Sequence, residues 1–262
     1  MERRVARAED LPPLELRRVR TLELEEPSSP GGTPHVAAAS GVVRRAEYVY
    51  VIADDELDLA VFDASSDAPG RLVPALSGEL PSDHEARSKA KPDLEALTSL
   101  PPFEGHPHGA LLGLGSGSTT DRDRGFAWAL AADGSLDGEP IELDLAPLYT
   151  LLRERLDALN VEGAAVMEDE LWLLQRGNSE HGENVVVALS CAEVLESLGR
   201  DRPQAQGRGR SRTARHRRDR DDLRVRSGRP RGALAAAVGH DGARGRPELG
   251  REARPKPRTG SR

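Results

Sequence analysis

The sequence predicts a mainly β protein, and the chief observation behind this prediction is that two stretches of the chain resemble each other. Each stretch contains three short apolar segments typical of strands, separated by connections rich in turn residues. The segments are 93–97, 109–112 and 126–130 in the first stretch, and 160–164, 171–174 and 185–189 in the second. Self-similarity of this kind is the signature of repeat architectures.

A weaker third copy precedes these two. Its segments are Ala38–Val43, Tyr48–Ile52 and Leu57–Phe62, and a further alternating segment, Val19–Glu26, also reads as a strand. Repeated sheets of three or four strands joined by polar turns build β-propellers, which usually have about four to eight blades. We therefore expect a partial β-propeller over residues 16–200, with blade-like units near 34–63, 93–131 and 160–190.

Two short helices are expected between and after the repeated strands. Leucines at helical spacing between Leu148 and Leu159 predict an amphipathic helix, with Pro147 in its first turn and Asp144 as its cap. A second helix should follow the last strand, because Ser190 and Glu193 form a capping-box pattern and Gly199 is a natural stop.

The composition changes near residue 200, although the net charge of the whole chain, −7, conceals it. Residues 1–200 hold 18 Lys and Arg against 37 Asp and Glu, a formal charge of −19, whereas residues 201–262 hold 19 against 7, a charge of +12. The second segment is mostly Arg, Gly, Ala and Pro and has no aromatic residue, so it cannot bury enough apolar surface to order itself. We expect a flexible N-terminus at 1–15 and a disordered basic tail at 201–262.

Two interpretations of this tail stay open. A GC-rich gene translated out of frame yields mainly Arg, Gly, Ala and Pro, so the C-terminal part is interpreted first as a frameshift product that truncates the propeller. The alternative is a genuine basic tail. Clustered arginines neutralise phosphates, but without interleaved aromatic residues the tail should make only non-specific contact with nucleic acid.

Three segments carry a resemblance to a known group of proteins: 91–97, 160–164 and 173–178. They resemble an uncharacterised bacterial β-propeller family that is distantly similar to the esterase-like domain of some phytases. The resemblance spans about residues 15–200 and implies a propeller fold without an assigned reaction. It also implies further blades, which this chain lacks after residue 200.

Glu95 and Glu162 are the main candidate site residues. They occupy equivalent positions early in the first strand of their repeats, and the innermost strands of a propeller line its channel. Carboxylates from successive blades can hold a cation such as Ca²⁺, which is bound by several oxygens. The alternative is that each glutamate accepts backbone hydrogen bonds and fixes the blade register. Ser40 stands at the third equivalent position, which argues against a symmetric ring of metal ligands.

Arg176 and Asn178 are the other candidates, because they follow a strand at a point where loops reach the face of a propeller. Arg176 could bind a phosphate or carboxylate through two hydrogen bonds, oriented by Asn178. The competing interpretation is a hairpin turn with solvated charges. Asp93 and Asn160, which precede the two glutamates, are expected to be turn residues that bond their own backbone.

Other motifs point to no chemistry. His106 and His108 have the spacing of a metal pair but lack a third ligand, so a solvent-exposed loop is expected. The glycine-rich run 113–118 is not followed by a helix pattern, which excludes dinucleotide and P-loop interpretations and predicts a flexible hairpin connection. Cys191 is the single cysteine, which excludes an internal disulfide and suits a packing role.

Two functions from different classes follow. The first is a β-propeller module that binds an unidentified small molecule or protein. The second is a cation-dependent hydrolase of a phosphoester or ester, with Glu95 and Glu162 binding a cation, Ca²⁺ for example, and Arg176 holding the anionic group. No apolar run approaches the length of a membrane span or signal peptide, so we expect a bacterial cytoplasmic protein that does not bind membranes.

Overall fold

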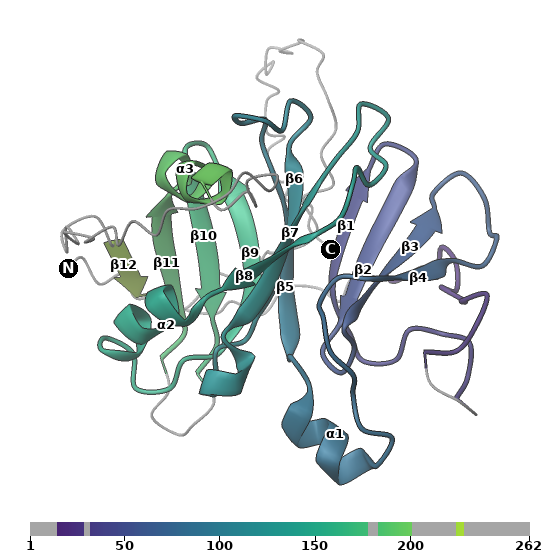
Figure 1. Ribbon diagram of the computed structural model, residues 1–262, viewed down its shortest axis with the longest axis horizontal. Helices are drawn as coiled ribbons and strands as arrows, with labels where there is room; N and C mark the ends of the chain where they lie inside the picture. The colour runs from purple at the N-terminus through teal and green to yellow at the C-terminus, as the bar shows by residue number, and fades with distance from the viewer. Residues whose placement is uncertain (1–14, 29–31, 178–182, 201–223, 228–262) are drawn as a thin grey trace, which may run out of the picture. The chain divides into compact units, whose positions relative to one another are not determined.

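The computed structural model describes residues 15–28, 32–177, 183–200 and 224–227. These residues form three antiparallel sheets of four strands each, accompanied by short helices (Figure 1). Within every sheet each strand pairs with its neighbours in the sequence. The prediction of a mainly β protein is therefore confirmed.

The sheets follow one another along the chain. The first sheet holds β1 (Ala39–Arg45), β2 (Tyr48–Ala53), β3 (Asp58–Asp63) and β4 (Arg71–Pro74). The second holds β5 (Leu94–Leu100), β6 (Ala110–Gly115), β7 (Arg124–Ala129) and β8 (Ile141–Asp144). The third holds β9 (Val161–Met167), β10 (Glu170–Gln175), β11 (Val185–Ser190) and β12 (Arg224–Ser227).

The strands differ from the predicted ones mainly at the outer side of each sheet. The fourth strands, β4 and β8, were not expected, because they are short and follow irregular loops. The strand expected at Val19–Glu26 is wrong: in this segment only Glu23 and Leu24 form bridges, to His35 and Gly70. The flexible hairpin connection expected at 113–118 is wrong in its first half, because residues 113–115 belong to β6, and all residues of this strand are buried.

In the described part of the chain, three α-helices accompany the sheets. α1 (His84–Ala90) was not predicted, although Asp83 caps it by accepting a hydrogen bond from the Ala86 amide. α2 (Ala146–Arg153) has Pro147 in its first turn, as expected, but ends sooner than the leucine pattern suggests. α3 (Cys191–Arg200) is capped by the Ser190 hydroxyl, which accepts from the Glu193 amide, and it continues through Gly199.

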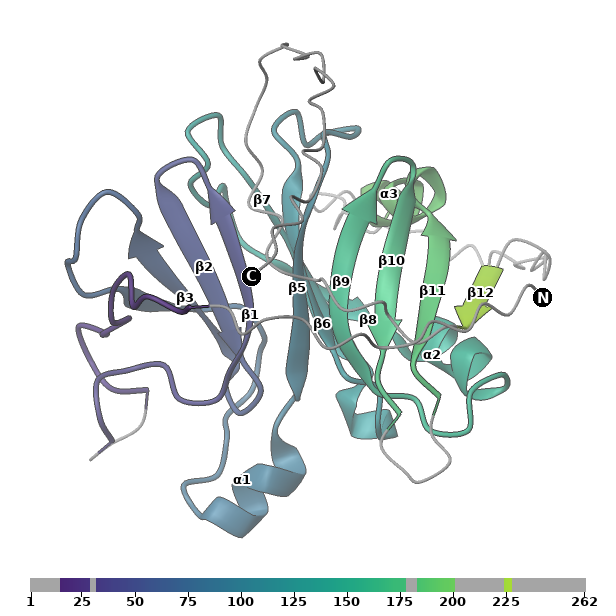
Figure 2. The ribbon, with the colours of Figure 1, turned by 180° about the vertical axis from the view of Figure 1, so that it is seen from behind.

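The sheets pack through their faces, and their first strands β1, β5 and β9 lie next to one another (Figure 2). One apolar cluster fills the space between the first and second sheets; it includes Tyr50, Ile52, Leu59, Leu97, Leu111, Phe126 and Trp128. A second cluster joins the second and third sheets with α2 and α3; it includes Leu112, Leu114, Tyr149, Leu152, Val161, Leu171, Leu173, Val187 and Leu198. Each fully buried side chain of this size contributes about 2 kcal/mol to stability.

A third, smaller cluster lies on the other face of the first sheet. The N-terminal segment contributes Leu22, Leu24 and Val36, which pack against Val51, Ala60, Phe62 and neighbouring residues. Arg20 holds this segment in place by donating hydrogen bonds to the carbonyls of Asp63 and Ser66 at 2.7 and 2.6 Å.

Most of the segments expected to be disordered, 1–15 and 201–262, lie outside the described residues. The exception within 201–262 is β12, which pairs antiparallel with β11. Among the described helices, none has the length and apolar character needed to cross a membrane.

Candidate functional site

The first strands of the three sheets share a β-bulge at the same place. In β1 the register passes over Ser40, in β5 over Glu95 and in β9 over Glu162. A bulge leaves one residue without a partner across the ladder and re-aims its side chain. The three positions that the sequence aligns therefore have the same structural setting, and two of them carry a carboxylate.

Backbone hydrogen bonds repeat around these bulges. In each sheet, the residue that follows the second strand donates its amide to the carbonyl two residues before the bulge; the three bonds are Asp54 to Ala38, Ser116 to Asp93 and Arg176 to Asn160. The carbonyls of Asp54 and Ser116 in turn accept amides from the next sheet, those of Asp93 and Val161, at 3.0 and 2.8 Å. These bonds connect neighbouring sheets beside the bulges.

Asp93 is held by several donors. Its backbone adopts a positive φ of 56°, a conformation that Asp tolerates better than most residues. Its buried carboxylate accepts hydrogen bonds from Ser116 Oγ at 2.6 Å and Arg122 Nη1 at 2.9 Å, and Lys91 Nζ lies 2.9 Å away. Burial alone would raise the pKa of Asp93, but the bonds from Ser116 and Lys91 and the charge of Arg122 lower it. Asp93 therefore bonds residues distant in sequence, where a local turn was expected.

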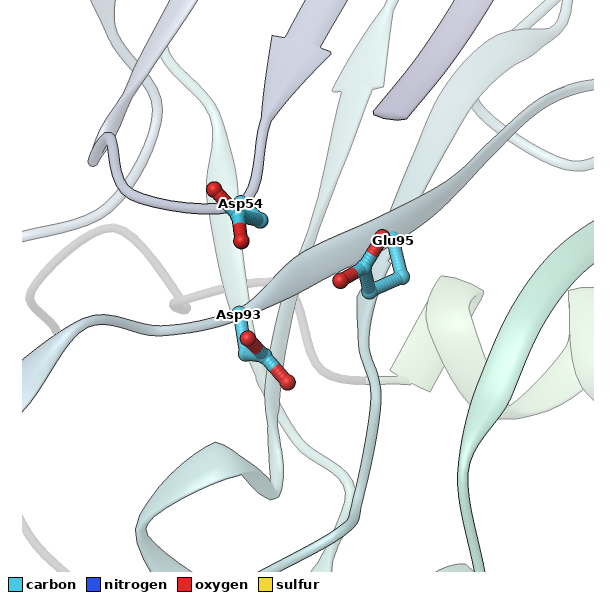
Figure 3. Close-up of side chains that lie close together, drawn as sticks. All are labelled: Asp54, Asp93 and Glu95. Carbon is cyan, nitrogen blue, oxygen red and sulfur yellow. The ribbon is translucent and has the colours of Figure 1, made fainter. Parts of the chain in front are cut away.

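Lys91 bridges two carboxylates. Its ammonium contacts Asp54 as well as Asp93, and these bonds raise its pKa although burial opposes them. Asp54, Asp93 and Glu95 each place a carboxylate oxygen within 4.8 Å of the others (Figure 3). The cluster is therefore three carboxylates from the end of β2 and the start of β5, partly neutralised by one lysine.

Glu95 differs from its neighbours. Among the described residues, no donor forms a hydrogen bond or ion pair with its half-buried carboxylate. Burial, together with the negative charges of Glu162, Asp93 and Asp54, raises the pKa of Glu95 to about 7. Because the charge of Glu162 contributes to this shift, the two glutamates of adjacent sheets lie close enough to repel each other. Glu95 thus exchanges its proton near neutral pH.

Glu162 is paired. Arg176 Nη2 lies 2.7 Å from its carboxylate, and the Asn160 side-chain amide donates to the same oxygen. The Arg176 side chain stays 62% exposed, so it can also reach a ligand. Asn178, expected to orient Arg176, lies outside the described residues. The structure therefore brings Glu95, Glu162 and Arg176 into one region and leaves the role of Asn178 a prediction.

Ser40 completes the set of bulge residues without adding a charge. Its hydroxyl donates a hydrogen bond of 2.5 Å to the Leu94 carbonyl and so fastens the first sheet to the second. The site is asymmetric, as the serine at this position implied.

The remaining motifs have structural settings. His106 is buried, with its ring 4.4 Å from that of Phe103, so the exposed loop expected there is only partly right; His108 is exposed. Ser116, inside the glycine-rich run 113–118, is fully buried against Asp93. Burial raises the pKa of the Cys191 thiol, which fits a packing role.

Sequence reasoning missed Asp54, Lys91 and Arg122 as parts of the site. They carry no motif and are contributed by segments up to 37 residues from the carboxylates they meet. A weak signal was available for Lys91, since it stands two residues before Asp93.

Comparisons with known proteins add one finding about identity. The crystal structure of LS24, a seed albumin from Lathyrus sativus, aligns with this chain at 8% sequence identity and a TM-score of 0.30, over 58% of this chain and 60% of the albumin. The chain therefore spans less than two thirds of the length of that structure. A search of curated proteins found no match. Residues 35–210 match the profile of the family of unknown function DUF6929, so the chain belongs to that family.

Proposed function

We propose that this chain is a β-propeller-type binding module that holds a positively charged group or a metal cation at Glu95. The propeller arrangement is supported by three up-and-down sheets of four strands whose first strands lie side by side, and the shared bulge supports an internal repeat. The location in the bacterial cytoplasm remains part of this proposal.

The observation that carries the ligand proposal is the difference in pairing between Glu95 and the other carboxylates. Asp54 and Asp93 share Lys91, Asp93 also has Arg122, and Glu162 has Arg176. Glu95 alone among these four lacks a cationic partner within hydrogen-bonding distance, in the part of the chain that the structure describes. A half-buried carboxylate of this kind gains most from a ligand that supplies a positive charge.

The type of cation follows from the oxygens present. Ca²⁺ takes six to eight oxygen ligands, and a Ca²⁺ ion at Glu95 would compete with the Lys91 ammonium for Asp54 and Asp93. An ammonium group needs fewer ligands and can bind Glu95 while Lys91 stays in place. We therefore expect an organic ammonium to bind at least as well as Ca²⁺.

The test is calorimetric titration of the full chain with CaCl₂ and, separately, with spermidine, in two buffers of different ionisation enthalpy. Binding of Ca²⁺ at pH 7 should release part of a proton, because the ion favours ionised Glu95, and this release should vanish at pH 9, where Glu95 is already ionised. Glu95→Gln should abolish both the binding and the proton release, whereas the exposed Glu104→Gln should change neither. Equal binding by Glu95→Gln and the original chain would contradict the proposal.

A second candidate, a cation-dependent phosphoester or ester hydrolase, is favoured by two features of the site. The pKa of Glu95, about 7, suits a general acid or base at neutral pH, and the exposed Arg176 beside Glu162 is placed to contact an anionic group. Release of p-nitrophenol from its phosphate and acetate esters, with and without Ca²⁺, tests this alternative. Turnover that is lost in both Glu95→Gln and Arg176→Ala would replace the binding module with the hydrolase.

A further inference from the structure

The same kind of apolar contact joins the first sheet to the second and the second to the third. The third sheet makes this contact with the second sheet but has no following sheet to contact on its other face within the described residues. In the first and second sheets, the second strand places two apolar side chains against the next sheet, four and two positions before the residue that follows the strand. These are Tyr50 and Ile52 in β2, and Leu112 and Leu114 in β6, and all four are buried. The corresponding residues of β10 are Trp172 and Leu174, which are only half-buried.

The first strand of the third sheet shows the same difference. The residue after the bulge faces the next sheet: a Cβ on Gly41 would lie 2.9 Å from Leu97, and Ala96 belongs to the core between the second and third sheets. Alternate positions of β9 on this side are Gly163, Ala165 and Met167. Met167 is 47% exposed, so this face of the third sheet carries an apolar surface that includes Trp172 and Leu174. We call it the last face.

The opposite end of the series has a matching surface. Two positions after the bulge, Leu97 of β5 packs against the first sheet and is 7% exposed. Its counterpart in β1 is Val42, which is 65% exposed. The N-terminal segment covers Val51, Ala60 and Phe62 on this side of the first sheet, but β1 itself stays open. We call the surface around Val42 the first face.

A backbone acceptor marks the same place. The carbonyls of Asp54 and Ser116 accept an amide from the sheet that follows each of them. Arg176 holds the equivalent position, and its carbonyl accepts from the adjacent Gln175 side chain at 3.1 Å. Within the described residues, no amide from another sheet bonds to the Arg176 carbonyl. The equivalent carbonyls of Asp54 and Ser116 each accept such an amide, so the Arg176 carbonyl can accept one from a further sheet.

We propose that a second copy of this chain occupies these surfaces, with the last face of each copy packed on the first face of the other. This inference rests on the propeller arrangement proposed above and not on its ligand. The last face, and the part of the first face at β1 that the N-terminal segment leaves exposed, correspond to the two halves of the interface already formed twice within the chain, and a two-fold pair buries both at once. The pair would contain six sheets, within the usual range of about four to eight for propellers, and its first strands would surround one channel.

The test is the mass of the full chain in solution, measured by light scattering and analytical ultracentrifugation over a wide range of concentration. We expect twice the 28.3 kDa of one chain. Val42→Arg, on the first face, and Leu174→Arg, on the last face, should each convert the dimer to monomer. Val19→Arg, at a residue that is 85% exposed and is not among the residues that define either face, is the matched control and should stay dimeric.

Mixing the two variants separates this arrangement from a symmetric contact of last face with last face. A mixed pair keeps one intact interface, so mixing Val42→Arg with Leu174→Arg chains should restore part of the dimer. Val42 is too exposed for its replacement to damage the fold, and a circular dichroism melt of that variant verifies this. A monomer at every concentration, or a dimer that Val42→Arg leaves intact, would overturn the proposal, whether or not Glu95 binds a cation.

Discussion

The second and third sheets carry a glutamate at the same bulge, yet the two carboxylates have different surroundings. In the third sheet, Glu162 is neutralised by Arg176 and bonded by Asn160. In the second sheet, the available cations pair with Asp93 instead, and Glu95 is left with a pKa of about 7. Structural equivalence therefore fixes where a side chain lies but not its charge state, which depends on partners from elsewhere in the chain.

The largest effect on stability is expected from substitution of Asp93, the residue two positions before the bulge of the second sheet. Asp93→Ala removes the carboxylate shared by Ser116, Lys91 and Arg122, and it should lower the free energy of unfolding by about 3 kcal/mol, because the partly buried Arg122 loses its carboxylate partner and Lys91 loses one of its two. Urea denaturation measures this loss.

Asp93→Asn is the matched variant, since asparagine also tolerates the positive φ but carries no charge. It should retain part of the stability. Because the folded state lowers the pKa of Asp93, the stability that this group adds is present above its unfolded pKa of about 3.9 and disappears as the pH falls through the lower folded value. A loss below about 1 kcal/mol in Asp93→Ala would remove the contrast between the bulges.

The equivalent substitution in the third sheet should lower the free energy of unfolding by less. Asn160→Ala removes the amide that donates to Glu162, and we expect a loss of about 1.5 kcal/mol, typical of one hydrogen bond to a charged acceptor. The same urea titration gives the value. A loss equal to that of Asp93→Ala would mean that the two bulges are held equally, in spite of their different pairing.

The lack of a partner at Glu95 makes stability depend on pH. Because folding raises the pKa of Glu95 from about 4.5 to about 7, the folded state binds its proton more tightly, and stability falls as the pH rises from about 4.5 to about 7. Glu95→Gln should abolish this fall and stabilise the protein at pH 8 by about 1 kcal/mol, after allowance for solvent screening. Thermal melts at several pH values measure it, with Glu104→Gln as control. An unchanged pH profile would show that Glu95 is ionised throughout.

The smallest effect is expected at Arg176, because its side chain is largely exposed. Arg176→Ala should cost less than about 1 kcal/mol, and less still at high salt. It should also raise the pKa of Glu95 further, since Glu162 would lose its neutralising partner. The pH profile of Arg176→Ala, compared with that of the original chain, tests this shift; a shift downward would show that Arg176 does not control the charge near Glu95.

Much of the fold could be predicted from local patterns. The strands around Glu95 and Glu162 stand out because short apolar runs end at turn residues, and the likeness of the two runs also identified the equivalent positions. The bulge itself was beyond prediction, because a register shift depends on the neighbouring strand. The fourth strands were missed since β4 and β8 have only four residues each and are half-buried or exposed.

The site was predicted less completely, for a physical reason. The charge of a carboxylate depends on cations within a few ångströms, and one of those that matter at this site comes from another segment: Arg122 reaches Asp93 across 29 positions of the sequence. The run 91–97 contains Lys91, but the sequence does not indicate that this lysine pairs with Asp93 and leaves Glu95 without a partner. Only the folded arrangement distinguishes them.

The short strand β12 has a practical consequence for the preparation of this protein. It covers the outer edge of β11, whose alternating Val185 and Val187 are buried. A chain shortened after α3 would expose a row of free amides and carbonyls along an apolar strand, the surface on which other chains add to form insoluble fibrils. A fragment for crystallisation should therefore keep Arg224–Ser227.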